Sequence, residues 1–335
     1  MPILVDRSPD TFLLHDLRGK GKVFVAMDGE QLVGCISIVF KQLYICGKPQ
    51  TVAYLADIRV HPDFFGSRAA PLLLHASRSH SLDMGVDLVF LMIAAGNTRA
   101  LALTKGRIGL PRFVSLGGTN IYGLLTSPIP PGKRKYEISA FHGGDMQEVL
   151  QLCNEFNRGY NFAPVVSEND IEPAEGPWVR CPPAQLLTAR RNGMLVANLA
   201  LHDLSPARQN IVMGAPFFMR AVIEMLRISG ALLPMFTFPR VGEELRMLYL
   251  RNVACHCDHQ DALRVLIQIA RNYAYKNKYS LVSIGLHERD PLQSLVRRTA
   301  KFTFGSIPFV TSLQNNYQVI QQIEKGVPFQ DAALM

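Results

Sequence analysis

The sequence contains little cysteine. Its six cysteines stand at irregular spacings in 335 residues, at positions 35, 46, 153, 181, 255 and 257. Disulfide frameworks occur in short, cysteine-dense secreted chains, so this pattern excludes one and indicates a reducing compartment. We therefore expect free thiols and a cytoplasmic protein.

Long apolar runs are also missing. The most apolar stretch, Ile228 to Pro239, covers 12 residues and contains Pro234, whereas a membrane-spanning helix needs about 20 apolar residues. The N-terminus has no basic region followed by an apolar core, so no signal peptide is expected. These absences predict a soluble protein with no membrane partner.

Charge is not concentrated in one place. The net charge is +8 and the pI about 9.2, which suits a phosphorylated ligand, but the 35 Lys and Arg are scattered and form one run, Lys133 to Lys135. Aromatic residues are not interleaved with the basic ones, as they are in proteins that bind single-stranded nucleic acid. We interpret the run as a solvated linker and expect no nucleic-acid partner.

The sequence does have the length and apolar content for two hydrophobic cores. It has 335 residues, of which 48% are hydrophobic and 19% charged, and this is enough for two domains. The proline-rich segment Ser127 to Gly132 can continue neither a helix nor a strand. We expect domains at 1–127 and 136–320, a linker at 128–135 and a C-terminal tail at 321–335.

In the first domain, apolar runs alternate with turn residues. Asp28-Gly29 and Gly47-Lys48 join neighbouring runs, so two β-hairpins are expected between Lys22 and Val60. A turn with Gly66 at its tip and a helix from Ala69 follow the strand that ends at Val60. The remaining expected elements are a helical turn near 12–17, a strand at 86–94, a helix capped by Asn97, and a closing hairpin of 113–116 with 120–125 about Gly117-Gly118.

A similar series is expected in the second domain. It starts with a strand at 136–140, a helix at 145–156 and a hairpin at 186–201 that turns on Asn192-Gly193. The later expected elements are a helix at 215–228, a strand at 245–254, an amphipathic helix at 261–276, a strand at 279–286, a helix at 291–298 and a strand at 302–310.

The two halves repeat one another in sequence. Matched apolar residues lie 163 residues apart at the first hairpin of each half (Ala26, Leu32 and Val33 with Ala189, Leu195 and Val196). Later matches lie 193 residues apart (Val60, Leu88 and Asn97 with Val253, Leu281 and Asp290). An insertion between Leu201 and Leu245 accounts for the difference. Copies of this length each close their own core, so we predict a duplicated α/β fold and not a solenoid.

Three stretches of the first half resemble the GNAT superfamily of acetyl-coenzyme A-dependent N-acetyltransferases. They are Val60-His61-Pro62-Asp63-Phe64, the glycine turn with its helix, and Asn97-Thr98-Arg99-Ala100. The family's loop pattern is Arg or Gln, two residues, Gly, one residue, then Gly or Ala. Phe65, Arg68 and Ala70 occupy these positions, so only the last matches. The resemblance implies two tandem GNAT-like acyl-CoA N-acyltransferase domains built on a mixed α/β sheet, an arrangement similar to that of mycothiol synthase.

The resemblance also implies an acetyl- or acyl-coenzyme A site in the first half. Turn N–H groups would hold the pyrophosphate at the residues Phe65, Gly66, Ser67, Arg68, Ala69 and Ala70. The backbone of Ile58, Arg59 and Val60 would pair with the pantetheine arm, and Asn97 either bonds to it or only caps its helix. Arg68 either blocks close approach or pairs with a phosphate.

Transfer of an acetyl group to an amine needs a group that takes the amine proton and a donor for the leaving thiolate. Asp57 and Arg59 share one face of their strand, so either Asp57 takes the proton through a water or the two form a structural ion pair. Thr104 stands where the family usually has a proton-donating Tyr, and a Thr hydroxyl is a far weaker acid. Tyr122 is an alternative donor.

The second half has a different turn at the matching place. Asp258 to Leu263 lacks glycine and puts two carboxylates where phosphates would lie, so we expect no coenzyme A there. Cys255 to His259 crowds cysteines and histidines into five residues without a second pair at zinc-finger spacing, so we expect a strand end and no metal. Trp178 either covers a ligand or belongs to the rim or core.

Together these features predict an acyltransferase that moves an acetyl or acyl group from coenzyme A to a small-molecule amine, as a monomer or homodimer. The alternative is a catalytically inactive tandem module that uses the same fold for binding or interaction.

Overall fold

The computed structural model describes residues 3–106, 111–130, 132, 135–214 and 239–335. The first half contains β1 (Ile3–Asp6), α1 (Leu13–Arg18), β2 (Lys20–Asp28), β3 (Gln31–Ile45), β4 (Lys48–Val60), α2 (Ala69–Asp83), β5 (Leu88–Ala94), α3 (Thr98–Leu103), β6 (Val114–Ser115) and β7 (Thr119–Leu125). The second half contains β8 (Glu137–Ala140), α4 (Met146–Asn157), β9 (Tyr160–Asn161), β10 (Ala163–Pro164), α5 (Glu168–Ile171), β11 (Pro183–Arg191), β12 (Met194–Asp203), β13 (Gln209–Val212), β14 (Met247–Cys255), α7 (Gln260–Lys276), β15 (Leu281–His287), α8 (Gln293–Val296), β16 (Ala300–Ser312), α9 (Tyr317–Lys325) and β17 (Val327–Pro328).

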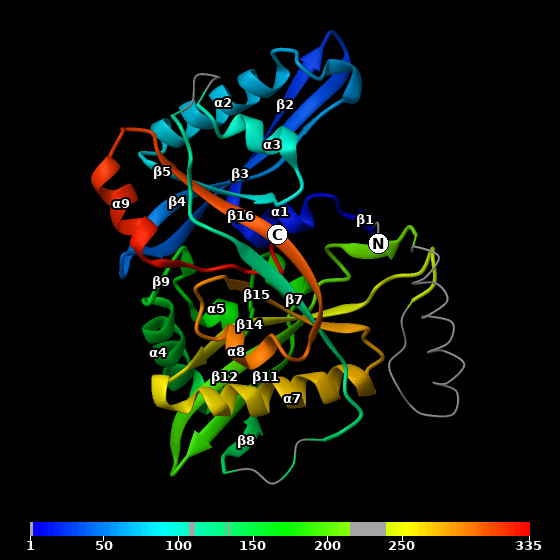
Figure 1. Ribbon diagram of the computed structural model, residues 1–335, viewed down its shortest axis with the longest axis vertical. Coiled ribbons are helices and arrows are strands. Elements are labelled where there is room, and N and C mark those ends of the chain that lie inside the picture. The colour runs from blue at the N-terminus through cyan, green and yellow to red at the C-terminus, as the bar shows by residue number, and fades with distance from the viewer. Residues whose placement is uncertain (1–2, 107–110, 131, 133–134, 215–238) are drawn as a thin grey trace.

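A 13-stranded mixed sheet runs through both halves, with α2 and α3 over the first half and α7 over the second (Figure 1). Its strand order is β10-β3-β4-β5-β16-β7-β15-β14-β12-β11-β8, with β2 on β3 and β6 on β16. The mixed α/β fold expected from the sequence is confirmed.

The predicted hairpins form where the turn residues stand. β2 meets β3 with Asp28 opposite Gln31, β3 meets β4 with Ile45 opposite Lys48, and β11 meets β12 with Arg191 opposite Met194. Each two-residue turn contains a glycine with positive φ, as tight hairpin turns require.

The halves exchange one strand each. β7 pairs antiparallel with β15 of the second half, and β16 pairs antiparallel with β5 of the first. β6 and β7 both pair with β16 and not with each other, so the predicted closing hairpin about Gly117-Gly118 is wrong. The segment instead crosses to the other half, where His287 Nε2 lies 2.9 Å from the Leu116 carbonyl oxygen. Each half therefore completes its sheet with a strand of the other.

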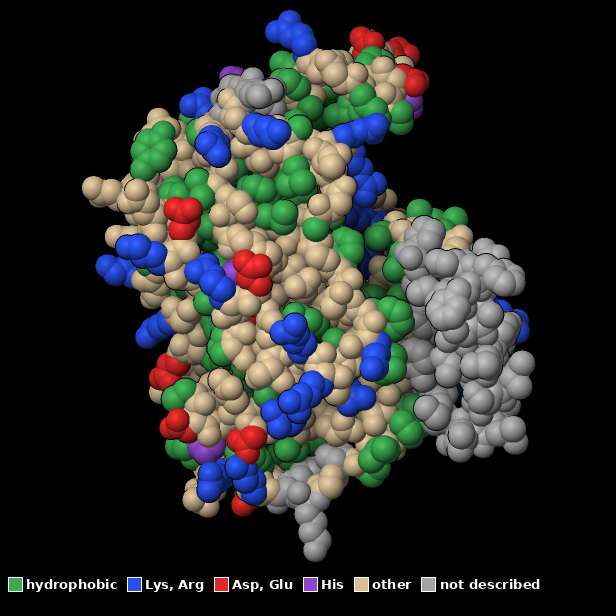
Figure 2. Space-filling view, viewed as in Figure 1, with side chains coloured by type: hydrophobic (Ala, Val, Ile, Leu, Met, Phe, Trp, Pro, Cys, Tyr) green, Lys and Arg blue, Asp and Glu red, His purple; other side chains and the backbone are tan. Residues whose placement is uncertain are grey.

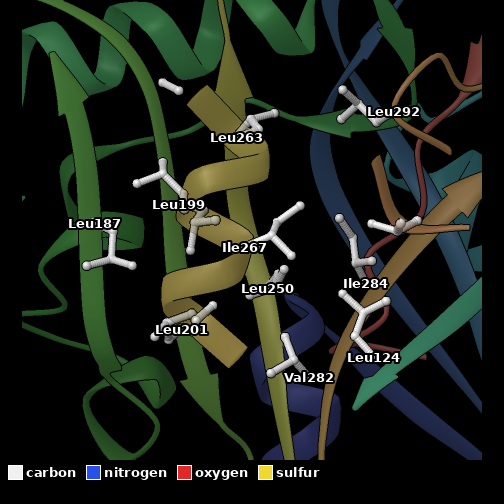
Figure 3. Close-up of a cluster of buried hydrophobic side chains, with 14 of the residues drawn as sticks. Leu124, Leu187, Leu199, Leu201, Leu250, Leu263, Ile267, Val282, Ile284 and Leu292 are labelled. Carbon is white, nitrogen blue, oxygen red and sulfur yellow. The ribbon is translucent and has the colours of Figure 1, made fainter. Parts of the chain in front are cut away.

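The exchanged strand β7 contributes to the core of the second half. Figure 3 shows Leu124 of β7 near Val282 and Ile284 of β15, in a cluster that also contains side chains of α7, β11, β12 and β14. Leu124 and Leu263 of α7 are fully buried, and each such leucine contributes about 1.5–3 kcal/mol to folding. In the first half, α2 packs Leu73 and Leu74 on β3 and β4.

The internal repeat is visible in the strand register, with one correction to the predicted spacing. β4 and β14 each carry a bulge at a residue in the left-handed region, Asp57 with φ +53° and Asn252 with φ +48°. Pairing places Val60 opposite Gly34 and Cys255 opposite Ala197, so Val60 corresponds to Cys255 and not to Val253. The spacing of 193 holds from Leu88 and Leu281 onward, because the turn and helix between these strands differ in length.

Three further expectations concern the inserted helix, membrane-crossing helices and the distribution of positive charge. The helix expected at 215–228 lies outside the described residues. Among the helices that the structure describes, none is long and apolar enough to cross a membrane. Lys and Arg side chains are spread over the face seen in Figure 2 and do not gather in one patch.

Candidate functional site

The candidate site begins where β4 and β5 separate. Their parallel pairing ends at Leu55 and Leu91, and beyond it the strands diverge around a cavity of about 260 Å³. Among the residues that line this cavity are Ala56, Asp57, Ile58, Arg59, Met92, Ala94, Asn97 and Thr104. Among the described strands, β4 has no partner on its β5 side beyond Leu55. Peptide groups of Ile58 to Val60 that point to that side are therefore available to a ligand.

The turn between β4 and α2 has unpaired backbone donors. Gly66 has φ +83° and nothing within 4 Å of the place where a side chain would begin. In the described part of the chain, no acceptor bonds to the backbone N–H groups of Gly66, Arg68 and Ala70. The Ala69 N–H donates to Ser67 Oγ at 3.2 Å. Three free N–H groups at the positive end of a 15-residue helix form a site suited to an anion.

Side chains from α3 border this turn. The Arg99 guanidinium lies 4.1 Å from the centre of the half-exposed Phe65 ring. Asn97 Oδ1 accepts from the Ala100 N–H at 3.1 Å, so Asn97 caps α3 while it also lines the cavity. The structure thus brings the start of α3, the turn and the divergent end of β4 together.

Asp57 forms ion pairs with two arginines from the N-terminal segment. Arg7 Nη1 and Nη2 donate to Asp57 Oδ2 and Oδ1 at 2.9 and 2.7 Å, and Arg18 Nη1 also donates to Oδ2. The predicted ion pair of Asp57 with Arg59 is therefore wrong. Burial raises the pKa of Asp57, but the hydrogen bonds and charges of Arg7 and Arg18 outweigh burial and hold this pKa well below its ordinary value.

The two candidate proton donors lie in different places. Thr104 lines the cavity and its hydroxyl donates to the Leu101 carbonyl oxygen at 2.8 Å. Tyr122 lies in β7, opposite Ile284 of β15, and its ring belongs to the core of the second half. The strand exchange thus carries Tyr122 away from the cavity lining.

The matching place in the second half is closed. β14 and β15 also diverge, after Tyr249 and Ser283, but the space between them measures only about 30 Å³. The C-terminal segment fills it: a Cβ added to Gly285 would lie 2.8 Å from the Gln330 carbonyl oxygen. Tyr160 adds its ring and donates to Asp290 Oδ1 at 3.2 Å. This half keeps the backbone geometry of the first but has no comparable room.

The second turn is acidic and engaged in local contacts. Asp261 accepts from the Tyr136 hydroxyl at 2.6 Å and pairs with Lys135. Burial raises the pKa of the Cys255 thiol to about 12, which disfavours the thiolate that binds metals. The described residues contain no group of three or more His, Cys, Asp or Glu placed to hold a metal ion.

A second, larger cavity lies between the halves. It measures about 770 Å³ and is bounded by β3, β4 and β5, by the loop with Trp178 and by the C-terminal segment. Trp178 is buried and stacks with Arg251, whose guanidinium lies 3.9 Å from the ring centre. Met92 lines both cavities, so they lie next to each other at β5. Sequence patterns did not reveal this cavity, because its walls come from segments far apart in the chain.

Comparison with known proteins agrees with this geometry. Residues 4–109 match the model of the acetyltransferase (GNAT) family. N-myristoyltransferase of Saccharomyces cerevisiae with bound myristoyl-CoA superposes with a TM-score of 0.56 at 10% sequence identity, over 84% of this chain and 67% of that one. A GCN5-related N-acetyltransferase of Kribbella flavida superposes with a TM-score of 0.51 at 14% identity, over 87% of this chain and 60% of that one.

These identities establish a shared fold, and the chain spans only about three fifths of the length of the Kribbella flavida protein. No curated protein matches the chain in sequence. The family match covers the half that holds the open cavity and the glycine turn. Residues 4–109 therefore match the acetyltransferase (GNAT) family in sequence, and the chain shares the fold of the two acyltransferases across both halves.

Proposed function

We propose that this protein transfers an acetyl or acyl group from coenzyme A to an amine, with coenzyme A bound in the first half. The observation that carries this proposal is the asymmetry between the halves. The space between β4 and β5 is open and next to unpaired N–H groups, whereas the space between β14 and β15 is filled.

The residues of the first half fit coenzyme A. The N–H groups of Gly66, Arg68 and Ala70 suit its pyrophosphate, because backbone donors at a helix start bind phosphate oxygens. Arg99 adds a positive charge beside the turn through its contact with Phe65. The unpaired edge of β4 suits the amide groups of the pantetheine arm, and Asn97 lies further along the same cavity.

Coenzyme A, when bound, supplies an acyl group activated as a thioester. The acceptor nitrogen forms the new C–N bond as the C–S bond breaks, and the proton lost from nitrogen leaves with the thiol. Catalysis by this chain then depends on orienting the amine at the end of the cavity. The larger cavity between the halves lies next to this point at Met92, so we place the acceptor there.

For Asp57 we propose a structural role. A carboxylate that two guanidinium groups hold in its ionised form is a weak proton acceptor. Its ion pairs fasten the N-terminal segment to the bulge of β4, next to the cavity. Thr104 stays a prediction for the proton donor, as do the monomeric or dimeric state and the cytoplasmic location.

Titration of acetyl-CoA into matched variants tests the proposal. Gly66→Asp adds a carboxylate at the turn, whereas Gly193→Asp adds one to an exposed hairpin turn with a similar backbone angle, φ +79° against +83°. We expect a micromolar Kd, or roughly −8 kcal/mol, for the wild type and Gly193→Asp, and at least about a tenfold weaker affinity for Gly66→Asp because the charges repel. Equal affinity of both variants would place the pyrophosphate elsewhere. Binding without acetyl transfer to any of a panel of amines would support the inactive module.

A further inference from the structure

The cavity between the halves has an aromatic floor. Tyr54 of β4 and Phe90 of β5 lie with ring centres 5.8 Å apart, and Phe162 stacks on Phe90 at 4.1 Å. Trp178 and Arg251, in contact with each other, also line the cavity. A cavity of about 770 Å³ is within the usual range for small-molecule sites, roughly 300–1,000 Å³. Its apolar floor suits a ligand with an aromatic or aliphatic body.

Lys41 brings a positive charge to this cavity. Its side chain is half-buried. Lys41 lies on the same face of β3 as Val39, which pairs with Tyr54 of β4. Among the residues that the structure describes, the Lys41 ammonium has no hydrogen-bond or ion-pair partner, and it lies 5.9 Å from the centre of the Tyr54 ring. Burial lowers the pKa of Lys41 to about 8, although Asp331 opposes this.

The carboxylates near Lys41 already have partners. Asp331 Oδ2 accepts from Arg251 Nε at 3.0 Å and Oδ1 accepts from the Ala333 N–H at 3.0 Å. Asp170 Oδ2 accepts from the N–H and hydroxyl groups of Ser167. Neither carboxylate therefore forms an ion pair with the Lys41 ammonium. A buried cation without an anionic partner favours the binding of an anionic ligand.

Arg251 supplies a second unsatisfied cationic group. The residue is 8% exposed, and its Nη1 is buried with no hydrogen-bond partner in the described residues. Its Nε donates a hydrogen bond to Asp331, and its guanidinium group lies over the ring of Trp178. A buried guanidinium N–H without an acceptor destabilises the folded state, and an anionic group bound in this cavity would accept its hydrogen bond.

We propose that the acceptor is an amine that also carries a carboxylate, such as an apolar amino acid, whose body lies on Tyr54 and Phe90 and whose carboxylate binds between Lys41 and Arg251. This inference rests on the proposed acyl transfer, because it names the class of acceptor for that reaction. The amine then points toward Met92, where the two cavities lie next to each other.

Phenylalanine and phenethylamine test the inference, because they differ only in the carboxylate. With acetyl-CoA as donor, we expect the wild type to acetylate phenylalanine with a kcat/KM at least about tenfold higher, since a charge-assisted hydrogen bond is worth that factor or more. Lys41→Met should raise the KM for phenylalanine and so remove this preference. It should leave the affinity for acetyl-CoA unchanged. Lys48→Met, which changes an exposed lysine outside the cavity, should behave as the wild type.

Preference for phenethylamine, an equal loss for both amines in Lys41→Met, or no loss in that variant would overturn the inference. So would a protein that binds acetyl-CoA and acetylates neither amine. If no acetyl-CoA binds, the proposed function fails, and direct titration of the two amines into wild type and Lys41→Met still tests the anion site. Equal binding of both amines would then refute it.

Discussion

Replacing Asp57 with asparagine isolates the charge at the centre of the first half. Asn252 occupies the matching bulge of the second half with φ +48°, close to the +53° of Asp57, so Asp57→Asn keeps the backbone conformation. The change leaves the guanidinium groups of Arg7 and Arg18 facing a neutral amide. The Arg18 side chain is 3% exposed and that of Asp57 19%, so this is the loss of one member of a largely buried ion pair. Such a loss destabilises proteins by about 3–5 kcal/mol, and we expect about 3 kcal/mol.

Urea denaturation between pH 3 and 8 measures the effect. Because the folded-state pKa of Asp57 lies below its ordinary value of 3.8, its stabilisation is fully present above that value and is lost as the pH falls through the folded-state pKa. The difference between wild type and variant should therefore be constant from pH 8 to 5 and shrink below about pH 4. Asp63→Asn is the control, since the Asp63 side chain is 81% exposed and its one ion pair within the described residues is with His61. It should change stability by less than about 0.5 kcal/mol.

A change in Asp57→Asn no larger than that of Asp63→Asn would refute the reasoning. Turnover separates the structural role from a role as proton acceptor. We expect Asp57→Asn to keep its kcat within about tenfold of the wild type at temperatures where it is folded, because general-base catalysis is worth about 10²–10⁴-fold. A fall of a thousandfold in a folded variant would show that Asp57 takes the proton.

Two changes test the closed second half. Gly285→Ala should lower stability by about 1–3 kcal/mol and speed amide exchange at β17, because the new Cβ would lie 2.8 Å from the Gln330 carbonyl oxygen; an unchanged melting temperature and exchange rate would contradict the packed tail. Burial raises the pKa of Asp290 from 3.8 to about 6. Ionisation of Asp290 therefore destabilises the folded state increasingly as the pH rises from about 4 to above 6. Asp290→Asn should therefore stabilise the protein about 1 kcal/mol more at pH 8 than at pH 5, and a pH-independent effect in urea denaturation would count against this.

Local patterns in the sequence determine much of the fold. The glycines at 29, 47 and 193 fix the hairpin turns, and apolar runs fix the strands. The run at 302–310 could be recognised as a strand, but its partner could not, because β5 and β7 offer similar apolar edges. The strand exchange depends on pairs 156 to 224 residues apart in the chain, from Leu125 with Leu281 to Leu88 with Ser312, and no local periodicity encodes them.

The candidate site was partly predictable for the same reason. Gly66 and Asn97 stand at local turn and cap positions, so their places follow from neighbouring residues. The partners of Asp57 lie 50 and 39 residues away in sequence, and Lys41 and Arg251 line one cavity only because the halves are joined. The local sequence around Arg7 and Arg18 does not indicate which carboxylate they will pair with.

The number of coenzyme A sites per chain tests the central claim most directly. Calorimetric titration of acetyl-CoA into the wild type should give one site per chain, because only the first of the two related halves keeps its strands apart around an open cavity. Two sites, or a site that survives Gly66→Asp at full affinity, would contradict the account.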